Sequence, residues 1–282
     1  MKKKICMILI AVFVAVLGTS TYFIIDHYKE SNKQAELYGE LVDLVNAAAQ
    51  TDAATEPAKQ IPYSEEKMLL PELAELYQQN GDLVGWISIA DTNINYPVMQ
   101  SVNEPNFYLK HGFDKEYSDY GCPYVQEDCD VQEPSDNLVI YGHHMSNGSM
   151  FAHLEKFKSK DFWSEHRMIT FNILTDKQEY EIVAVFRTVV YTDSPEAFKF
   201  YRFIDAESAN EFDDFIAKSK ELSFYDTGVT AEYGDKLITL STCEYSRNNS
   251  RLVVVAKRIT EDGGADAAKT HAEATAEGER PN

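Results

Sequence analysis

Cys243 and Arg251 are placed to act together on an acyl group. Cys243 ends a strand-like run, Thr-Leu-Ser-Thr-Cys, and Arg251 comes eight residues later, directly before the apolar run Leu-Val-Val-Val-Ala. We expect the two runs to form a β-hairpin with a polar turn, which places the thiol beside the guanidinium. A neighbouring cation favours the thiolate, the form of cysteine that attacks carbonyl carbons. The same cation can stabilise the oxyanion of a tetrahedral intermediate.

Two histidines lie about a hundred residues upstream, at the end of another strand-like run. The sequence there is Ile-Tyr-Gly-His-His-Met, in which His143 and His144 follow Gly142. Histidine is the usual acid–base partner of a catalytic cysteine. Neighbouring side chains on an extended chain point to opposite sides, so we expect at most one of the two to face Cys243.

These elements resemble the signature of the sortase family, and within it class B. The signature is a strand ending in Thr-Leu-x-Thr-Cys, a downstream arginine that opens the next strand, and an earlier histidine directly after a glycine. All three are present in the family order, and the resemblance covers about residues 69–259. It selects His143 rather than His144, and Arg251 rather than Arg247, which lies in the turn.

The resemblance implies a cysteine transpeptidase with three catalytic residues. Cys243 would attack a peptide carbonyl and form a thioester acyl-enzyme. His143 would protonate the leaving amine and later deprotonate the incoming amine. Arg251 would bind the oxyanion and the substrate.

Four further residues are expected to bind the substrate. Ser241 and Thr242 would line the pocket, Tyr141 matches the strand-end tyrosine of class B members, and the backbone N–H of Glu244 is the expected second oxyanion donor. Residues 192–201 are similar in place to the class B loop that holds the sorting peptide. The aromatic side chains of this loop are equally compatible with packing against the helix that follows.

The rest of the sequence of this domain predicts a mainly β fold with about eight strands. Short apolar runs separated by turn signals predict a closed or nearly closed barrel, and the resemblance implies the sortase barrel with a helical lead-in at its N-terminus. Before the cysteine strand, a long helix is expected from an N-cap at Asp205 to a stop near Gly228, similar to the class B insertion. Its buried face would carry Ala209, Phe212, Phe215, Ile216 and Ser219. The expected strands are 83–89, 94–99, 138–141, 168–172, 178–191, 236–241 and 252–259.

Residues 5–25 form an uncharged, mostly apolar run that follows three lysines. A run of about 20 such residues is long enough to cross a membrane as a helix. The lysines predict a cytoplasmic N-terminus and an extracellular catalytic domain. A cleaved signal peptide is the alternative, but its apolar region is usually only ~7–15 residues long. We therefore expect a signal-anchor over 1–27, a helical stalk and linker over 28–68, the catalytic domain over 69–260 and a disordered polar tail over 261–282.

Composition excludes several other classes of protein. The chain has 26 Lys and Arg against 46 Asp and Glu, a formal charge of −20, whereas nucleic-acid binding requires a basic surface. No metal-ligand spacing is present, so neither a metal nor another cofactor is expected. The cysteines are too few for a disulfide scaffold. Cys122 and Cys129 are compatible either with one disulfide or with two inert thiols.

The favoured function is that of a membrane-anchored transpeptidase on the outer face of a Gram-positive-type cell. Its partners would be exported proteins with a C-terminal sorting signal and an amine of the cell-wall peptide, without nucleic acid. A pilin-polymerising sortase and a non-catalytic surface-binding protein on the same barrel are the alternatives. The polar tail favours wall anchoring over pilin assembly. The presence of His143, Cys243 and Arg251 together argues against a non-catalytic protein.

Overall fold

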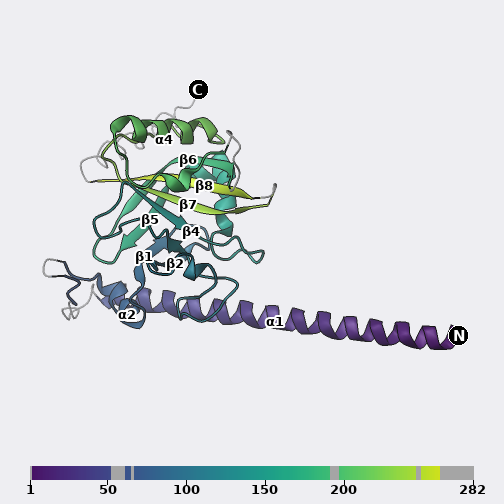
Figure 1. The fold of residues 1–282 in the computed structure, drawn as a ribbon. Helices are drawn as coiled ribbons and strands as arrows, with labels where there is room; N and C mark the ends of the chain where they lie inside the picture. The colour runs from purple at the N-terminus through teal and green to yellow at the C-terminus, as the bar shows by residue number, and fades with distance from the viewer. Residues whose placement is uncertain (1, 52–60, 65–66, 191–196, 246–248, 261–282) are drawn as a thin grey trace, which may run out of the picture.

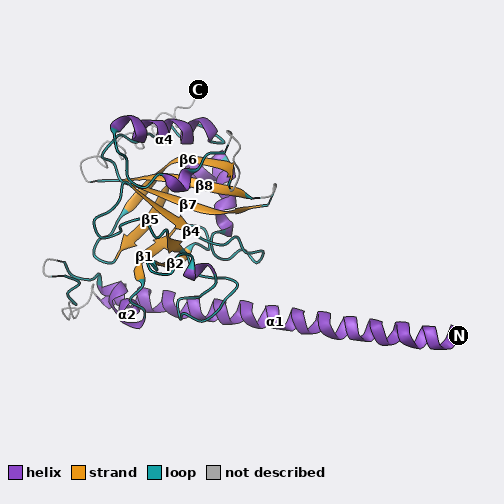
Figure 2. Ribbon diagram, in the orientation of Figure 1, coloured by secondary structure: helices purple, strands orange, loops and turns teal. Residues whose placement is uncertain are grey.

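A closed barrel of eight strands forms the centre of the described protein (Figures 1 and 2). The computed structural model describes residues 2–51, 61–64, 67–190, 197–245 and 249–260. Around the barrel the strand order is β1-β2-β3-β4-β7-β8-β6-β5, which confirms the predicted fold class. The strands are β1 (Leu83–Ser88), β2 (Asn95–Met99), β3 (Tyr124–Val125), β4 (Asn137–Tyr141), β5 (Met168–Ile173), β6 (Glu179–Val189), β7 (Leu237–Glu244) and β8 (Ser250–Arg258).

Strand direction brings three strand ends together at one end of the barrel. β4 and β7 are parallel, so both finish at the same end. β8 is antiparallel to β7, and it therefore begins where β7 finishes. The ends of β4 and β7 and the start of β8 are the places where the sequence puts its histidine, cysteine and arginine. The topology thus assembles residues that are about a hundred positions apart in the chain.

The central strands are buried along almost their whole length. In β7, every residue is buried except Cys243, which is partly exposed. The adjoining strand β8 is buried from Leu252 to Ala256. Because both faces of these strands are covered, β8 is a continuous apolar run from Leu252 to Ala256, and the polar residues of β7 other than Cys243 are buried as well. Cys243 is therefore the exception in β7, because its thiol reaches solvent from an otherwise buried strand.

Helix α4 (Ala209–Leu222) covers β6, as Figure 1 shows. The predicted buried face is correct for Phe212, Phe215, Ile216 and Ser219, whereas Ala209 is exposed. Burial of each large apolar side chain contributes about 1.5–3 kcal/mol to the free energy of unfolding.

The predicted N-cap of this helix at Asp205 is wrong. Ser208 caps the helix, because its side chain accepts a hydrogen bond from the Glu211 N–H. Asp205 instead accepts hydrogen bonds from Ser135 Oγ at 3.1 Å and from the Asp136 N–H at 2.9 Å. Its carboxylate therefore joins the segment before β4 to the segment before α4.

A single helix, α1 (Lys2–Thr51), contains both the predicted anchor and the predicted stalk. It extends far beyond the barrel toward the N-terminus (Figure 1). Its C-terminal half packs on the domain through the buried side chains of Tyr38 and Leu41, and the Tyr38 hydroxyl donates to the Gly121 carbonyl at 2.7 Å. The second helix, α2 (Pro71–Gln79), packs against α1. Most of the expected linker (52–60) and the expected tail (261–282) lie outside the described residues.

Candidate active site

A cavity of about 290 Å³ lies where the ends of β4 and β7 meet the start of β8. His143, Cys243 and Arg251 all line it. A larger cleft of about 640 Å³ lies beside Cys129 and contains none of the three. Acyl transfer needs a nucleophile, an acid–base group and an oxyanion donor within reach of one substrate, and the smaller cavity is the one that supplies them.

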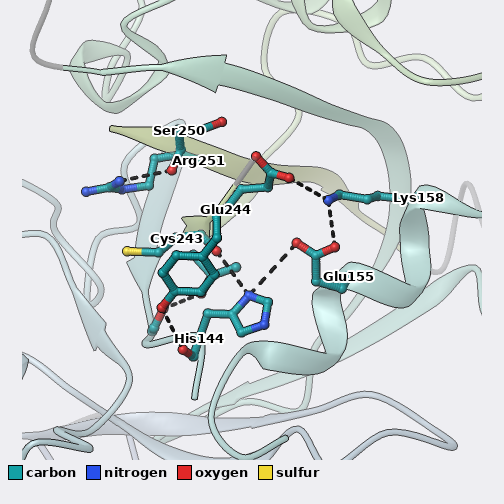
Figure 3. A network of polar contacts seen from close by, with 10 residues as sticks. His144, Glu155, Lys158, Cys243, Glu244, Ser250 and Arg251 are labelled. Atoms are coloured by element: carbon teal, nitrogen blue, oxygen red, sulfur yellow. Dashed lines mark hydrogen bonds and ion pairs between the residues drawn. The ribbon is translucent and has the colours of Figure 1, made fainter. Parts of the chain in front are cut away.

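Cys243 and Arg251 are directly opposite each other in the antiparallel ladder of β7 and β8. Directly opposed residues have side chains on the same face, with Cβ atoms about 4.5–5.5 Å apart. Figure 3 shows the thiol and the guanidinium on the same side of the hairpin. One guanidinium nitrogen of Arg251 donates to the carbonyl of Ser250 at 3.0 Å. The arrangement places a permanent cation beside the thiol, as the sequence predicts.

His143 is held by a backbone carbonyl on the opposite wall of the cavity. Its Nε2 lies 2.8 Å from the carbonyl oxygen of Leu109. A carbonyl only accepts hydrogen bonds, so Nε2 carries the hydrogen and Nδ1 is left to exchange a proton in the neutral ring. Burial lowers the pKa of His143 below its usual value, and the hydrogen bond to Leu109 offsets part of this effect. The imidazole is therefore mostly neutral at neutral pH.

Gly142 is bonded to the cysteine strand and lies against the ring of Phe151. Its N–H donates to the Ser241 carbonyl at 3.1 Å, and its own carbonyl accepts from the Thr242 hydroxyl at 2.8 Å. A Cβ atom at position 142 would lie 2.5–2.9 Å from ring atoms of the buried Phe151. Only glycine fits here without displacing that ring, which explains physically why glycine precedes the histidine.

His144 lies outside the cavity. Its Nδ1 is 3.1 Å from the carbonyl oxygen of Cys243, and Figure 3 shows its ring on the side of the strand away from the thiol. The structure therefore places His143 with the thiol of Cys243 and His144 behind it.

The four predicted substrate-binding residues separate into two groups. Tyr141, Ser241 and Thr242 line the cavity. Ser241 is 2 % exposed, and its hydroxyl has no hydrogen-bond partner among the described residues. Glu244 is paired with Ser250 in the ladder and does not line the cavity; its carboxylate binds Lys158 Nζ at 2.9 Å. The role of its N–H as an oxyanion donor stays a prediction.

The loop before α4 packs against the helix, and one of its residues also lines the cavity; its role in holding a sorting peptide stays a prediction. Phe198 packs against Phe186 and, across to α4, against Phe215, with ring centroids 5.7 Å and 5.6 Å apart. Tyr201, three residues later, lines the cavity. Residues 191–196 and the turn that contains Arg247 lie outside the described residues.

Sequence reasoning missed six other residues that line the cavity: Asn106, Leu109, Cys122, Tyr124, Gln126 and Glu127. Leu109 ends the short 3₁₀ helix η1 (Phe107–Leu109), and its contribution is a backbone carbonyl, for which no side-chain pattern exists. Cys122 and Cys129 are both free and buried, not joined by a disulfide. Burial raises the pKa of each thiol to about 12, so both stay protonated. Among the described residues, no cluster of His, Cys, Asp or Glu is arranged to hold a metal ion.

His143 and His166 should titrate on opposite sides of the usual histidine pKa. Burial lowers the pKa of His143, whereas the carbonyl of Phe162 and then the carboxylate of Asp91 raise the pKa of His166. As pH rises, His143 should therefore lose its proton before His166 does. NMR titration of the ring C–H resonances, assigned with the single histidine variants, measures both values. An equal or inverted order would contradict the burial of His143.

The family model of the sortase domain matches residues 87–259. The chain belongs to the sortase family. Sortase B of Listeria monocytogenes is 35% identical over 193 residues, covering 67% of this chain and 74% of the relative. Sortase B of Staphylococcus aureus is 30% identical over 191 residues, covering 67% and 75%. The protein is therefore a class B sortase and a cysteine transpeptidase, as the sequence predicts.

Solved sortase structures share the fold of this sortase. The Staphylococcus aureus sortase B–substrate complex superimposes with a TM-score of 0.70 at 26% identity, covering 83% of this chain and 99% of the other.

Proposed function

We propose that this sortase joins exported proteins with a C-terminal sorting signal to an amine of a cell-wall peptide. The observation that carries the proposal is the single cavity in which His143, Cys243 and Arg251 meet. The related staphylococcal enzyme has been solved with a substrate, and the shared barrel supports a comparable substrate site here.

In the proposed reaction, Nδ1 of His143 takes the proton of the Cys243 thiol, and the resulting thiolate attacks the carbonyl carbon of the sorting motif. Arg251 stabilises the resulting oxyanion. The C–N bond breaks, the amine leaves with a proton from His143, and a thioester remains on Cys243. The thioester conserves the energy of the peptide bond until an amine of the wall peptide arrives. His143 takes the proton of this amine as it attacks, and the thiolate is released.

The N-terminal half of α1 is the proposed membrane anchor. The large apolar side chains between Ile5 and Ile25 that the structure describes are about half exposed or more, and this helix is long and apolar enough to cross a bilayer. Exposed apolar surface on this scale is unfavourable in water. Insertion with the three lysines on the cytoplasmic side places the barrel outside the cell.

Incubation of the detergent-solubilised full chain with a panel of sorting peptides tests the proposal. Each reaction also contains one amine acceptor: oligoglycine, a diaminopimelate dipeptide or a lysine peptide. Mass spectrometry should detect a peptide thioester on Cys243 and an amide product that forms only when an amine is present. A lysine peptide used in preference to the wall-type amines would favour pilin assembly instead. Absence of any adduct on Cys243 with every peptide would contradict the proposal.

His143→Ala should lower the rate of amide formation by at least ~10²-fold, the usual scale for loss of acid–base help. His153→Ala is the matched control, since His153 is held by the backbone N–H of Asn93 and does not line the cavity. Steady-state assays of both variants measure the difference. Comparable losses in the two variants would remove His143 from the mechanism.

A further inference from the structure

A polar network lies behind the thiol, on the side of β7 that faces away from the cavity (Figure 3). His144 Nδ1 is 3.1 Å from the carbonyl oxygen of Cys243 and 3.9 Å from Glu155 Oε1. Lys158 bridges two carboxylates, with its Nζ 2.6 Å from Glu155 Oε2 and 2.9 Å from Glu244 Oε1. Glu155 and Lys158 both belong to the 3₁₀ helix η2 (Ala152–Lys158). The network therefore ties η2 to the end of β7.

His144 continues the β4–β7 ladder after β4 has ended. The last backbone hydrogen bond between them runs from the Gly142 N–H to the Ser241 carbonyl. In a parallel ladder the next carbonyl on the same edge belongs to the residue two positions on, which is Cys243. Here the donor is the imidazole of His144 rather than a backbone N–H. Since a carbonyl only accepts, Nδ1 carries the hydrogen.

The two neighbouring histidines are thus fixed as opposite tautomers. His143 donates from Nε2 to the Leu109 carbonyl, and His144 donates from Nδ1 to the Cys243 carbonyl. The first makes no hydrogen bond through Nδ1 to any of the described residues, and the second is engaged with the backbone of the nucleophile. The ring of His143 can therefore exchange protons with the substrate, whereas the ring of His144 holds the end of β7.

The residues that follow Cys243 are held at further points. The Tyr245 hydroxyl donates to the His144 carbonyl at 2.9 Å, and its ring meets the His144 ring edge-on at 5.1 Å. Glu244 is only 5 % exposed, and a buried carboxylate is costly unless a partner compensates it. Lys158 provides that partner. Positions 243, 244 and 245 are consequently each fixed by a different contact.

We propose that His144 is a positioning residue of the transpeptidation reaction. By holding the Cys243 carbonyl, it fixes the end of β7 so that the thiol stays opposite Arg251 and in the cavity with His143. The inference rests on the proposed role of Cys243 as the nucleophile. Misplacement of a reacting atom by about 1 Å can cost on the order of 10² in rate, so one hydrogen bond to the backbone of the nucleophile has a kinetic effect.

Comparison of His144→Leu with His144→Asn in the full chain tests the proposal. Leucine retains bulk without a donor, whereas asparagine retains a side-chain N–H. For His144→Leu we expect kcat to fall on the order of tenfold, the effect of losing one net hydrogen bond, with KM within about twofold of wild type. His144→Asn should recover most of the lost kcat, and the melting temperatures of the two variants should agree.

His166→Leu is the matched control. The His166 ring also contacts a backbone carbonyl, that of Phe162 at 2.8 Å, as well as Asp91 at 3.0 Å, but it does not line the cavity. Its loss should leave kcat near the wild-type value. An Asn variant as slow as the Leu variant, or a His166→Leu variant that loses as much kcat as His144→Leu, would overturn the proposal.

A second measurement needs no peptide substrate. The rate at which iodoacetamide alkylates Cys243, followed by mass spectrometry of the peptide containing it, should fall several-fold in His144→Leu and recover in His144→Asn, because the thiolate is the reactive form and depends on the nearby cation. Equal alkylation rates in wild type and His144→Leu would overturn the positioning role. If the wild type joins no peptide at all, the proposed function fails, and the alkylation rates alone decide the role of His144.

Discussion

Cys243→Ala is expected to abolish both peptide cleavage and amide formation. The thiol is the atom that forms the acyl bond, and Cys243 is the one residue of β7 that is not buried. Loss of a nucleophile in other hydrolytic enzymes costs on the order of 10⁶ in kcat, so no product should be detectable above the uncatalysed reaction. Liquid chromatography of the peptide and of its amide product measures both activities.

Cys129→Ala is the control for this variant. Cys129 is also a free thiol, but it is buried, its pKa is raised to about 12 by that burial, and it does not line the cavity. Its removal should leave kcat nearly unchanged and lower only the melting temperature, because a buried side chain that bonds the backbone of Asn137 and Val139 is lost. Residual turnover in Cys243→Ala, with the alanine confirmed by mass, would refute the thioester mechanism.

Arg251→Lys should lower kcat/KM by about 10²–10³-fold although the charge is retained. Loss of one oxyanion donor has this magnitude in other enzymes. A guanidinium is a rigid planar fork of donors, whereas an ammonium is a point charge on a flexible stem. The fork of Arg251 is already oriented by its hydrogen bond to the Ser250 carbonyl, and a lysine at this position would not reproduce that geometry.

Arg258→Lys provides the same substitution at the other end of the same strand. Arg258 is paired with Tyr180 in the β6–β8 ladder and does not line the cavity. We expect the Arg258→Lys enzyme to turn over peptide at the wild-type rate. Equal activity of Arg251→Lys and Arg258→Lys, with matching melting curves, would reduce Arg251 to a general electrostatic role.

The meeting of three proposed catalytic residues in one cavity could be predicted because each lies next to a strand end. A strand end is visible in the sequence as the point where an apolar run stops, and topology then brings the ends together. His143, Cys243 and Arg251 are of this kind. The choice of His143 over His144 needed the family resemblance, because alternation alone says only that the two rings face opposite ways.

Other features could not be predicted because they depend on contacts between distant segments. Strand β3 has two residues, too few for a periodic pattern. Asp205 has the composition of a helix cap, but its carboxylate binds the segment before β4, about 70 residues away. The carbonyl of Leu109 contributes to the site through the backbone, so its side chain carries no signal. Lys158 forms an ion pair with Glu244, which is 86 positions away in the sequence.

Because α1 is one uninterrupted helix, it would set the height of the catalytic domain above the bilayer if its N-terminal half is the proposed anchor. With residues 5–25 in the membrane as proposed, only residues 26–33 separate the membrane from Gln34, which is buried against the domain. At 1.5 Å per residue, this segment is about 12 Å long. A domain on a long flexible tether would sample a wide volume of the cell wall. With the proposed anchor, this domain would be confined to a thin layer next to the lipid, where membrane-bound substrates would reach it by lateral diffusion in two dimensions.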